Sequence, residues 1–122
     1  MNYDSLEFNV VVKIKKDNLH VLGPGIKQLL ELTETSGSLR AASKQINMSY
    51  SKAHGIIKNS EITMGYPLLK RRIGGVGGGS SCLTEKGGQF LNQYKLFEKE
   101  LADTLLLLSQ KYFSENTKAS VD

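Results

Sequence analysis

The feature that most limits what this chain can fold into is a long amphipathic pattern in its last third. Thr84 is a suitable N-cap, and the residues after it predict one helix of roughly 30 residues, which would be about 45 Å long. The core of a small domain can cover the beginning of this helix, at Phe90, Leu91 and Tyr94, but not the apolar residues several turns further on. Those later residues, spaced by threes and fours, are Phe97, Leu101, Leu105, Leu108 and Tyr112. The pattern therefore predicts that the helix from Thr84 to Phe113 pairs with its copy in a homodimer, with these residues at the interface.

The start of the chain predicts a β-hairpin that leads into a helix. Residues 6–15 contain β-branched residues in partial alternation, which is typical of a strand. Lys16-Asp17-Asn18 favours a turn, and residues 19–22 favour a short returning strand. Gly23-Pro24-Gly25 then ends the extended segment, and its proline suits the first turn of a helix.

Three helices are predicted in the next 40 residues or so. The first has apolar residues at helical spacing from Ile26 and ends near Ser36-Gly37, where glycine suits a C-cap. Ser38 and Ser49 are suitable N-caps for two further helices, both short and tightly joined. Their predicted inward residues are Leu39, Ala42 and Ile46 in the one, and Ala53, Ile56 and Ile57 in the other.

A glycine-rich run separates two more short strands, which are predicted at residues 68–73 and 82–83. A phosphate-binding loop is one interpretation of this run, but that motif needs Gly-Lys-Ser/Thr before a helix, whereas Gly79 precedes Ser80 and a strand. A flexible hairpin is favoured instead. Its bare backbone can approach a sugar-phosphate ridge while Lys70, Arg71 and Arg72 supply positive charge, so the hairpin is predicted to be a wing.

Positive charge is concentrated in the middle of the chain. The net charge is +4, but residues 40–72 hold seven basic residues against one acid, Glu61, a balance of +6. A nucleic-acid-binding face requires such a concentration, because neutralised phosphates release condensed counterions. A solvated surface segment would also account for the charge taken alone.

Residues 37–53 have the pattern of a helix-turn-helix. Ala42 and Ala53 are small enough to let two helices cross closely about a short turn. Spacing alone fits an ordinary helical hairpin equally well. If the inward residues of the third helix are as predicted, its outward residues are Ser51, His54, Gly55 and Lys58. At His54, a buried or merely exposed histidine is as compatible with the sequence as a DNA contact.

The motifs in combination resemble known DNA-binding domains. Residues 37–72, including Ser49-Tyr50-Ser51-Lys52-Ala53 and Gly65-Tyr66-Pro67-Leu68-Leu69-Lys70-Arg71, are similar to the DNA-binding domain of LysR-type regulators. The glycine-rich run followed by Leu83-Thr84-Glu85-Lys86-Gly87, together with Leu22-Gly23-Pro24-Gly25, resembles the N-terminal domain of the ModE family of molybdate-responsive repressors. The resemblance covers roughly residues 6–101, most of the chain. It implies a winged helix-turn-helix domain that binds duplex DNA as a dimer.

The resemblance also implies a set of contact residues, since the third helix of these families lies in the major groove. The candidate DNA-binding residues are Ser38, Arg40, Ser49, Tyr50, Ser51, Lys52, His54, Lys58, Arg71, Arg72, Gly77 and Gly78. Two residues depart from the family pattern, because His54 stands where tryptophan is usual and Glu85 where proline is usual. The surface of the reading helix is therefore expected to differ. The molybdate-sensing domains of ModE are absent from this sequence, so no molybdate site is expected here.

The predicted fold class is α+β, mainly α: a winged helix-turn-helix with an N-terminal β-hairpin and a long C-terminal dimerisation helix. Residues 1–83 would form the DNA-binding domain with its wing hairpin, residues 84–113 the dimerisation helix and residues 114–122 a flexible tail. The predicted function is that of a sequence-specific, double-stranded DNA-binding transcriptional regulator acting as a homodimer. A winged-helix module that binds another protein and not DNA is the alternative.

Other classes of protein find little support. The sequence contains no clustered acid-base pair, nucleophile motif or metal-ligand spacing, so no enzyme, cofactor or metal site is expected. Cys82 is the single cysteine and cannot form an internal disulfide, which fits a reducing cytoplasm. The N-terminus lacks the pattern of a secretory signal, and the longest pure apolar run, residues 105–108, is too short to span a membrane.

Overall fold

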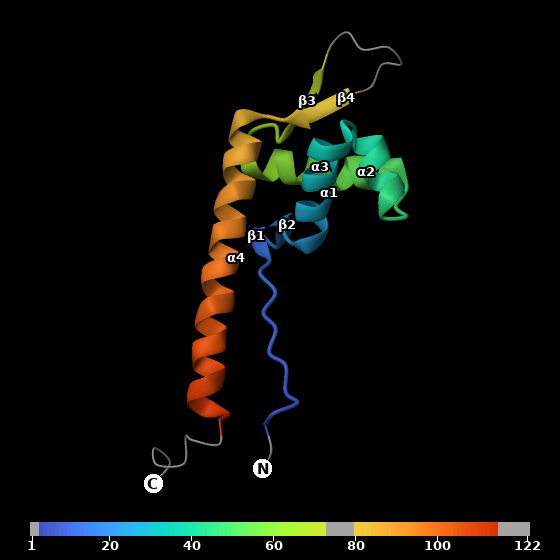
Figure 1. Cartoon of the computed structure of the whole chain (residues 1–122). Coiled ribbons are helices and arrows are strands. Elements are labelled where there is room, and N and C mark those ends of the chain that lie inside the picture. The colour runs from blue at the N-terminus through green and yellow to red at the C-terminus, as the bar shows by residue number, and fades with distance from the viewer. Residues whose placement is uncertain (1–2, 73–79, 115–122) are drawn as a thin grey trace. The chain divides into compact units, whose positions relative to one another are not determined.

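A computed structural model describes residues 3–72 and 80–114 of the chain (Figure 1). These residues fall into two compact units, which we call the winged unit (Val12–Gln93) and the terminal unit (Met1–Val11 with Tyr94–Asp122). The elements in chain order are β1 (Ile14–Lys16), β2 (Leu19–Leu22), α1 (Pro24–Ser36), α2 (Leu39–Gln45), α3 (Tyr50–Met64), β3 (Leu69–Arg72), β4 (Ser80–Leu83) and α4 (Glu85–Tyr112). The final helix begins in the winged unit and ends in the terminal unit.

The N-terminal hairpin is shorter than its sequence pattern suggests. Asp17 and Asn18 have φ angles of 52° and 65°, which gives β1 and β2 the two-residue turn that matches the twist of antiparallel strands. This turn places Lys16 opposite Leu19 and Lys15 opposite His20, and a shift in register between Lys15 and Ile14 then places Ile14 opposite Leu22. The prediction of a strand at residues 6–15 is wrong for the residues before Ile14. β2 ends at Leu22, so these residues have no partner in the hairpin.

Glycine and serine set the ends of the three central helices. Gly37 and Gly65 take left-handed φ angles of 88° and 84° and end α1 and α3. The Ser38 hydroxyl accepts the Ala41 amide at 3.0 Å, and Ser49 caps α3 in the same way, as predicted. The prediction that both later helices are short was wrong for α3, which has 15 residues: it continues through Gly55 and ends only at the left-handed Gly65.

The core of the winged unit lies where α1, α2, α3 and β2 pack together. Ala42 and Ala53 are both fully buried, which allows α2 and α3 to cross closely as the pattern predicted. Ile46 and Ile56, which were predicted to face inward, are half-buried at the edge of this core. The buried apolar residues of the unit are Val21, Leu22, Ile26, Leu29, Leu30, Leu39, Ala42, Ala53, Ile57, Leu68, Cys82 and Leu91.

Hydrogen bonds from the helices fix the base of the second hairpin. β3 and β4 pair antiparallel from Leu69↔Leu83 to Arg72↔Ser80, and β4 begins at Ser80, earlier than predicted. The Glu61 carboxylate of α3 accepts the amides of Leu68 and Leu69 at 2.7 and 3.2 Å. On the other strand, the Ser81 amide donates to the Gly37 carbonyl at 2.6 Å, and the Leu83 amide donates to Glu34 of α1 at 3.0 Å. The hairpin therefore leaves the unit from a base bonded to α1 and α3.

α4 starts against the same hairpin base. The Thr84 hydroxyl accepts the Gly87 amide at 2.9 Å, so Thr84 caps the helix as predicted. The Leu68 carbonyl accepts the Thr84 amide at 2.9 Å. A Cβ atom on Gly87 would lie 2.4 Å from the Leu68 oxygen, so glycine permits this close approach of helix and strand.

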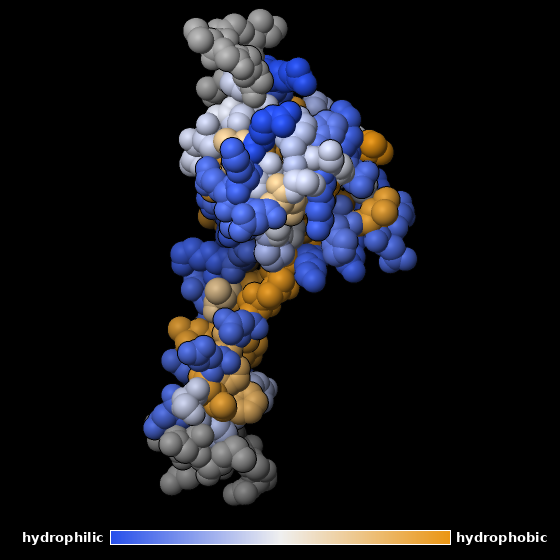
Figure 2. All heavy atoms as spheres, turned by 90° about the vertical axis from the view of Figure 1, so that its right-hand side faces the viewer, coloured by the Kyte–Doolittle hydropathy of each residue, from blue (hydrophilic) through white to orange (hydrophobic). Residues whose placement is uncertain are grey.

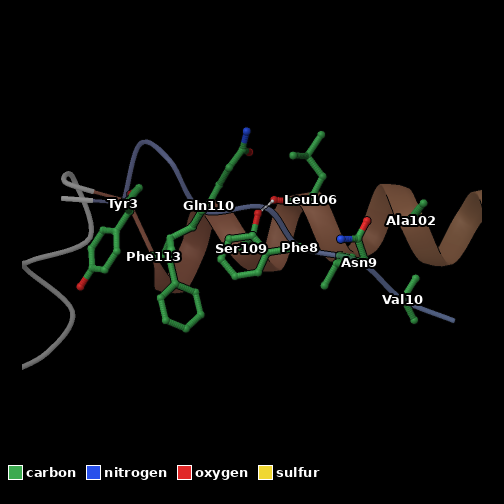
Figure 3. A pocket seen from close by; sticks show the side chains of 12 residues that line it. Tyr3, Phe8, Asn9, Val10, Ala102, Leu106, Ser109, Gln110 and Phe113 are labelled. Atoms are coloured by element: carbon green, nitrogen blue, oxygen red, sulfur yellow. Dashed lines mark hydrogen bonds between the residues drawn. The ribbon is translucent and has the colours of Figure 1, made fainter. Parts of the chain in front are cut away.

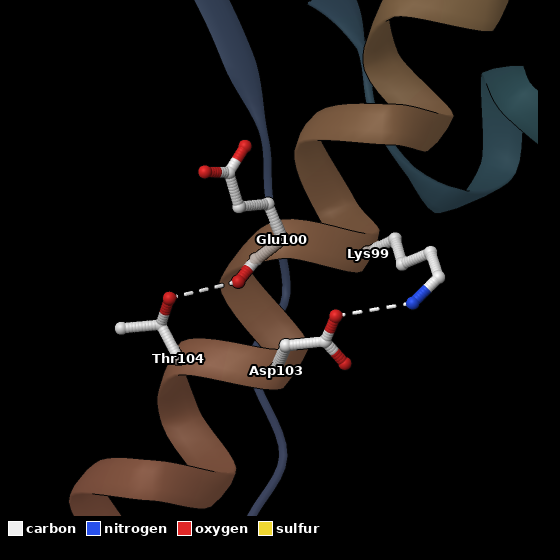
Figure 4. Close-up of polar contacts among 4 residues, drawn as sticks. All are labelled: Lys99, Glu100, Asp103 and Thr104. Atoms are coloured by element: carbon white, nitrogen blue, oxygen red, sulfur yellow. Dashed lines mark hydrogen bonds and ion pairs between the residues drawn. The ribbon is translucent and has the colours of Figure 1, made fainter.

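In the terminal unit, residues 3–11 run beside the end of α4 (Figures 1 and 3). Phe113 contacts the rings of Tyr3 and Phe8, with ring centroids 5.8 and 5.3 Å apart. Between the two segments lies a hollow of about 480 Å³ whose lining includes Leu105. The unit's polar face carries an exposed Lys99–Asp103 ion pair at 3.0 Å (Figure 4), which contributes little to stability because water screens it.

Candidate nucleic-acid interface

The outward face of α3 presents polar and basic side chains to solvent. Ser51, Lys52, His54 and Lys58 are all exposed, while Ala53 and Ile57 are buried beneath them. Gly55 is half-buried and has open space where a Cβ atom would be. The face therefore has the short, polar and basic side chains that can meet base edges and phosphates.

Two side chains from different helices stack at the start of this face. The Arg40 guanidinium of α2 lies 4.1 Å from the centroid of the Tyr50 ring, within the range of a cation–π contact. The Tyr50 ring in turn lies 5.8 Å from the ring of His54, one turn further along α3. Arg40 and Tyr50 were predicted as separate candidates, and the structure brings them into one stack.

The start of α3 and the strand β3 share a cleft of about 170 Å³. Tyr50, His54 and Lys58 line it from α3, and Lys70 and Arg71 line it from β3. Lys70 and Arg71 are exposed, so their charges lie at the same surface as the outward face of α3. We call this surface the basic cleft. It joins residues that are far apart in the chain into one positively charged site.

The other predicted residues lie around this site in different ways. Ser38 and Ser49 use their hydroxyls as acceptors to cap α2 and α3, which places them at helix starts. Arg72 ends β3 as the partner of Ser80. Gly77 and Gly78, predicted at the tip of the wing, lie outside the described residues.

Sequence reasoning missed the role of Glu61. It was counted only as the single acid in a basic segment, but its carboxylate accepts two backbone amides at the start of β3 and also lines the basic cleft. A carboxylate alone among basic residues was the available signal. Because its amide partners lie seven and eight residues away, their position depends on the chain reversal at Gly65.

The predicted dimer residues differ in exposure along α4. Phe97, Leu108 and Tyr112 are exposed, at 52%, 46% and 60% of their surfaces, whereas Leu101 and Leu105 are half-buried. Leu106 and Leu107 are exposed as well, and Figure 2 shows hydrophobic side chains interspersed with hydrophilic ones over this unit. At the start of the stretch Tyr94 is buried, and this burial, with the nearby Glu98 carboxylate, raises the pKa of its phenol.

Within residues 3–72 and 80–114, no three His, Cys, Asp or Glu side chains come together as metal ligands would. None of the helices in those ranges has an apolar stretch long enough to cross a bilayer.

Comparison with known proteins agrees with this geometry. The DNA-binding domain of CbnR, solved in complex with DNA, superimposes with a TM-score of 0.52 at 19% identity, covering 66% of this chain and 86% of that one. The fold is that of a winged helix-turn-helix domain.

The sequence comparison is more specific. Molybdenum transport protein ModE of Azotobacter vinelandii is 33% identical over 84 residues, which cover 69% of this chain and 31% of that protein. Transcriptional regulator ModE of Haemophilus influenzae is 29% identical over 90 residues, covering 74% of this chain and 35% of that protein. No family model matches the chain. Over the matched residues the chain is similar to these ModE proteins, and it spans about a third of the length of these curated relatives.

Proposed function

We propose that this protein is a transcriptional regulator that binds double-stranded DNA sequence-specifically, with α3 in the major groove and the β3–β4 wing along the backbone. The basic cleft is the observation that carries the proposal, because it puts His54 and Lys58 of α3 beside Lys70 and Arg71 of β3. The names of the ModE relatives and the DNA complex of the CbnR domain support the same function.

The proposal gives the side chains different tasks. Ser51 and His54 are exposed, and their polar side chains can form hydrogen bonds with base edges when α3 enters the groove. Lys58 and Arg71, with Arg72 at the end of β3, neutralise phosphates on either side of it. The cation–π contact of Arg40 limits the movement of the Tyr50 ring, so that Tyr50 meets the DNA in one orientation.

We further propose that the regulator is a homodimer paired through α4. Phe97, Leu108 and Tyr112 leave an apolar stripe in contact with water, and a copy of the same helix can cover it about a two-fold axis. Two reading helices would then meet successive turns of the major groove. The division into a DNA-binding domain (1–83), a dimerisation helix (84–113) and a tail (114–122) belongs to this proposal, as does a cytoplasmic location.

A salt titration distinguishes this function from a winged-helix module that binds only proteins. The affinity of the full chain for duplex DNA is measured between 50 and 200 mM salt, where each phosphate contact steepens the log–log slope by about 0.9. Replacing Lys70 and Arg71 by alanine is expected to flatten the slope by about 2.

The matched control for that variant is Lys99→Ala combined with Lys95→Ala. It removes the same charge from α4, outside the basic cleft, and is expected to leave the slope unchanged. A wild type without salt-dependent DNA affinity, or equal slopes for the two double variants, would refute the proposed function.

A further inference from the structure

The N-terminal segment carries an extended stretch whose backbone is unpaired. In the described ranges 3–72 and 80–114, no hydrogen bond joins the backbone of residues 7–11 to any other group, whereas the Leu6 amide just before them donates to the Tyr3 carbonyl at 3.2 Å. Val10 and Val11 are exposed at 45% and 61% of their surfaces. β-branched residues in an extended segment with free amides and carbonyls form a ready template for another strand.

Among residues 3–72 and 80–114, no strand pairs with this stretch. The strand that follows the stretch, β1, pairs with β2, but β2 ends at Leu22 and α1 begins at Pro24. On the other side the segment lies along α4, whose backbone groups are bonded within the helix. A strand from another molecule would satisfy the backbone groups of this stretch.

We propose that residues 7–11 pair antiparallel with the same residues of a second copy, about a two-fold axis that passes through Asn9. This inference rests on the proposed homodimer and adds a second interface element to it. In this register Phe8 lies opposite Val10 of the partner subunit, and Glu7 lies opposite Val11 of the partner subunit.

Charge and symmetry favour this arrangement over the alternatives. A parallel pair in register would place the two Glu7 carboxylates against each other, whereas the antiparallel pair sets each carboxylate beside a valine. The five unpaired residues are centred on Asn9, so this axis lets all of them pair. A two-fold contact also closes on itself, which limits the assembly to a dimer.

The strand pair is continuous with the α4 interface. Residues 3–11 border the end of α4, where Leu106 and Phe113 line the shared hollow with Phe8 (Figure 3). Leu108 and Tyr112, exposed on the same helical end, belong to the proposed stripe. One two-fold axis can therefore bring together both strands and both helices, and bury apolar surface from each.

Disulfide trapping tests the register in the full-length chain. Opposite residues of an antiparallel pair have Cα atoms about 5 Å apart, within the span of a disulfide. Asn9→Cys is therefore expected to form a covalent dimer under mild oxidation. Val11→Cys is the matched control, because the two copies of residue 11 are offset by four residues, or about 14 Å, in this register. Cys82 is buried and is common to all variants and to the wild type.

A mixed experiment checks the same register by a second route. Val11→Cys protein mixed with Glu7→Cys protein is expected to give a heterodimeric cross-link that neither variant gives alone. The proposal would be overturned if the Asn9→Cys and Val11→Cys variants formed equal amounts of disulfide-linked dimer. It would also be overturned if neither variant formed more than the wild type.

The outcomes for the strand pair and for the proposed function separate. A chain that sediments as a dimer and binds DNA, yet does not trap through Asn9→Cys, overturns the strand pair alone. Trapping through Asn9→Cys in a chain without DNA affinity supports the strand pair and overturns the DNA-binding function. Sedimentation of the wild type as a monomer overturns the proposed homodimer and the strand pair together.

Discussion

Replacing Gly87 by alanine is expected to destabilise the winged unit, whereas the same replacement at the adjacent Gly88 is not. The new Cβ atom at position 87 would lie 2.4 Å from the Leu68 oxygen and 3.0 Å from the Leu68 carbonyl carbon, both of them backbone atoms that cannot turn aside. At position 88 nothing lies within 4 Å of the new atom. α4 must therefore move away from the start of β3 in the first variant only.

The size of the effect follows from the contacts at this point. Overpacking costs about 1–3 kcal/mol. Moving the helix also strains the 2.9 Å bond from the Thr84 amide to the Leu68 carbonyl, and a lost hydrogen bond costs about 0.5–1.5 kcal/mol. Alanine in place of glycine within a helix returns about 0.5–1 kcal/mol. The net loss for Gly87→Ala is about 2–3 kcal/mol, and Gly88→Ala gains up to about 1 kcal/mol.

Urea unfolding of the wild type and both variants measures the difference. All three are compared at one protein concentration, because a dimer's stability depends on it. The two alanine variants are expected to differ by about 3 kcal/mol in free energy of unfolding. Equal stability of the two variants would refute the packing described between α4 and β3.

Three further predictions concern the site and its supports. Ser51→Ala with His54→Ala is expected to cost about 1–3 kcal/mol at a selected DNA site and almost nothing on random duplex; equal losses on both DNAs, measured by fluorescence anisotropy, would make them backbone contacts. Leu108→Asp puts a charge into the proposed helix pair, where unpaired burial costs several kcal/mol, so sedimentation should find a folded monomer; an unchanged dimer would contradict the α4 interface. Glu61→Ala removes the acceptor of two amides and is expected to lower the free energy of unfolding by about 1–3 kcal/mol, while wild-type stability in urea would contradict that role.

Local chemistry made much of the fold predictable. Ser38, Ser49 and Thr84 could be named as caps because a cap bonds an amide only three residues away. Gly37 could be named as a helix end because few other residues adopt its φ angle. The outward face of α3 followed from the period of the helix alone.

Features that depend on distant partners were not predictable in the same way. The strand expected at residues 6–15 has the right composition, but pairing stops at Ile14 because β2 is short. The Arg40–Tyr50 stack joins two helices, and its geometry depends on how closely α2 and α3 cross. The sequence predicts Lys70 only as a positive charge next to the wing. Its place in the basic cleft with His54 depends on the hydrogen bond between Glu61 and the start of β3, which the sequence does not reveal.

Selection of bound duplexes from a random DNA pool tests the central claim most directly, because it asks for sequence specificity and two-fold binding at once. The full chain is expected to enrich a palindromic site whose half-sites lie one helical turn, about 10 base pairs, or a multiple of it apart. Enrichment should disappear with the variant in which both Ser51 and His54 are alanine. A pool that shows no enrichment over random sequence, or that yields a single site without two-fold symmetry, would contradict the account.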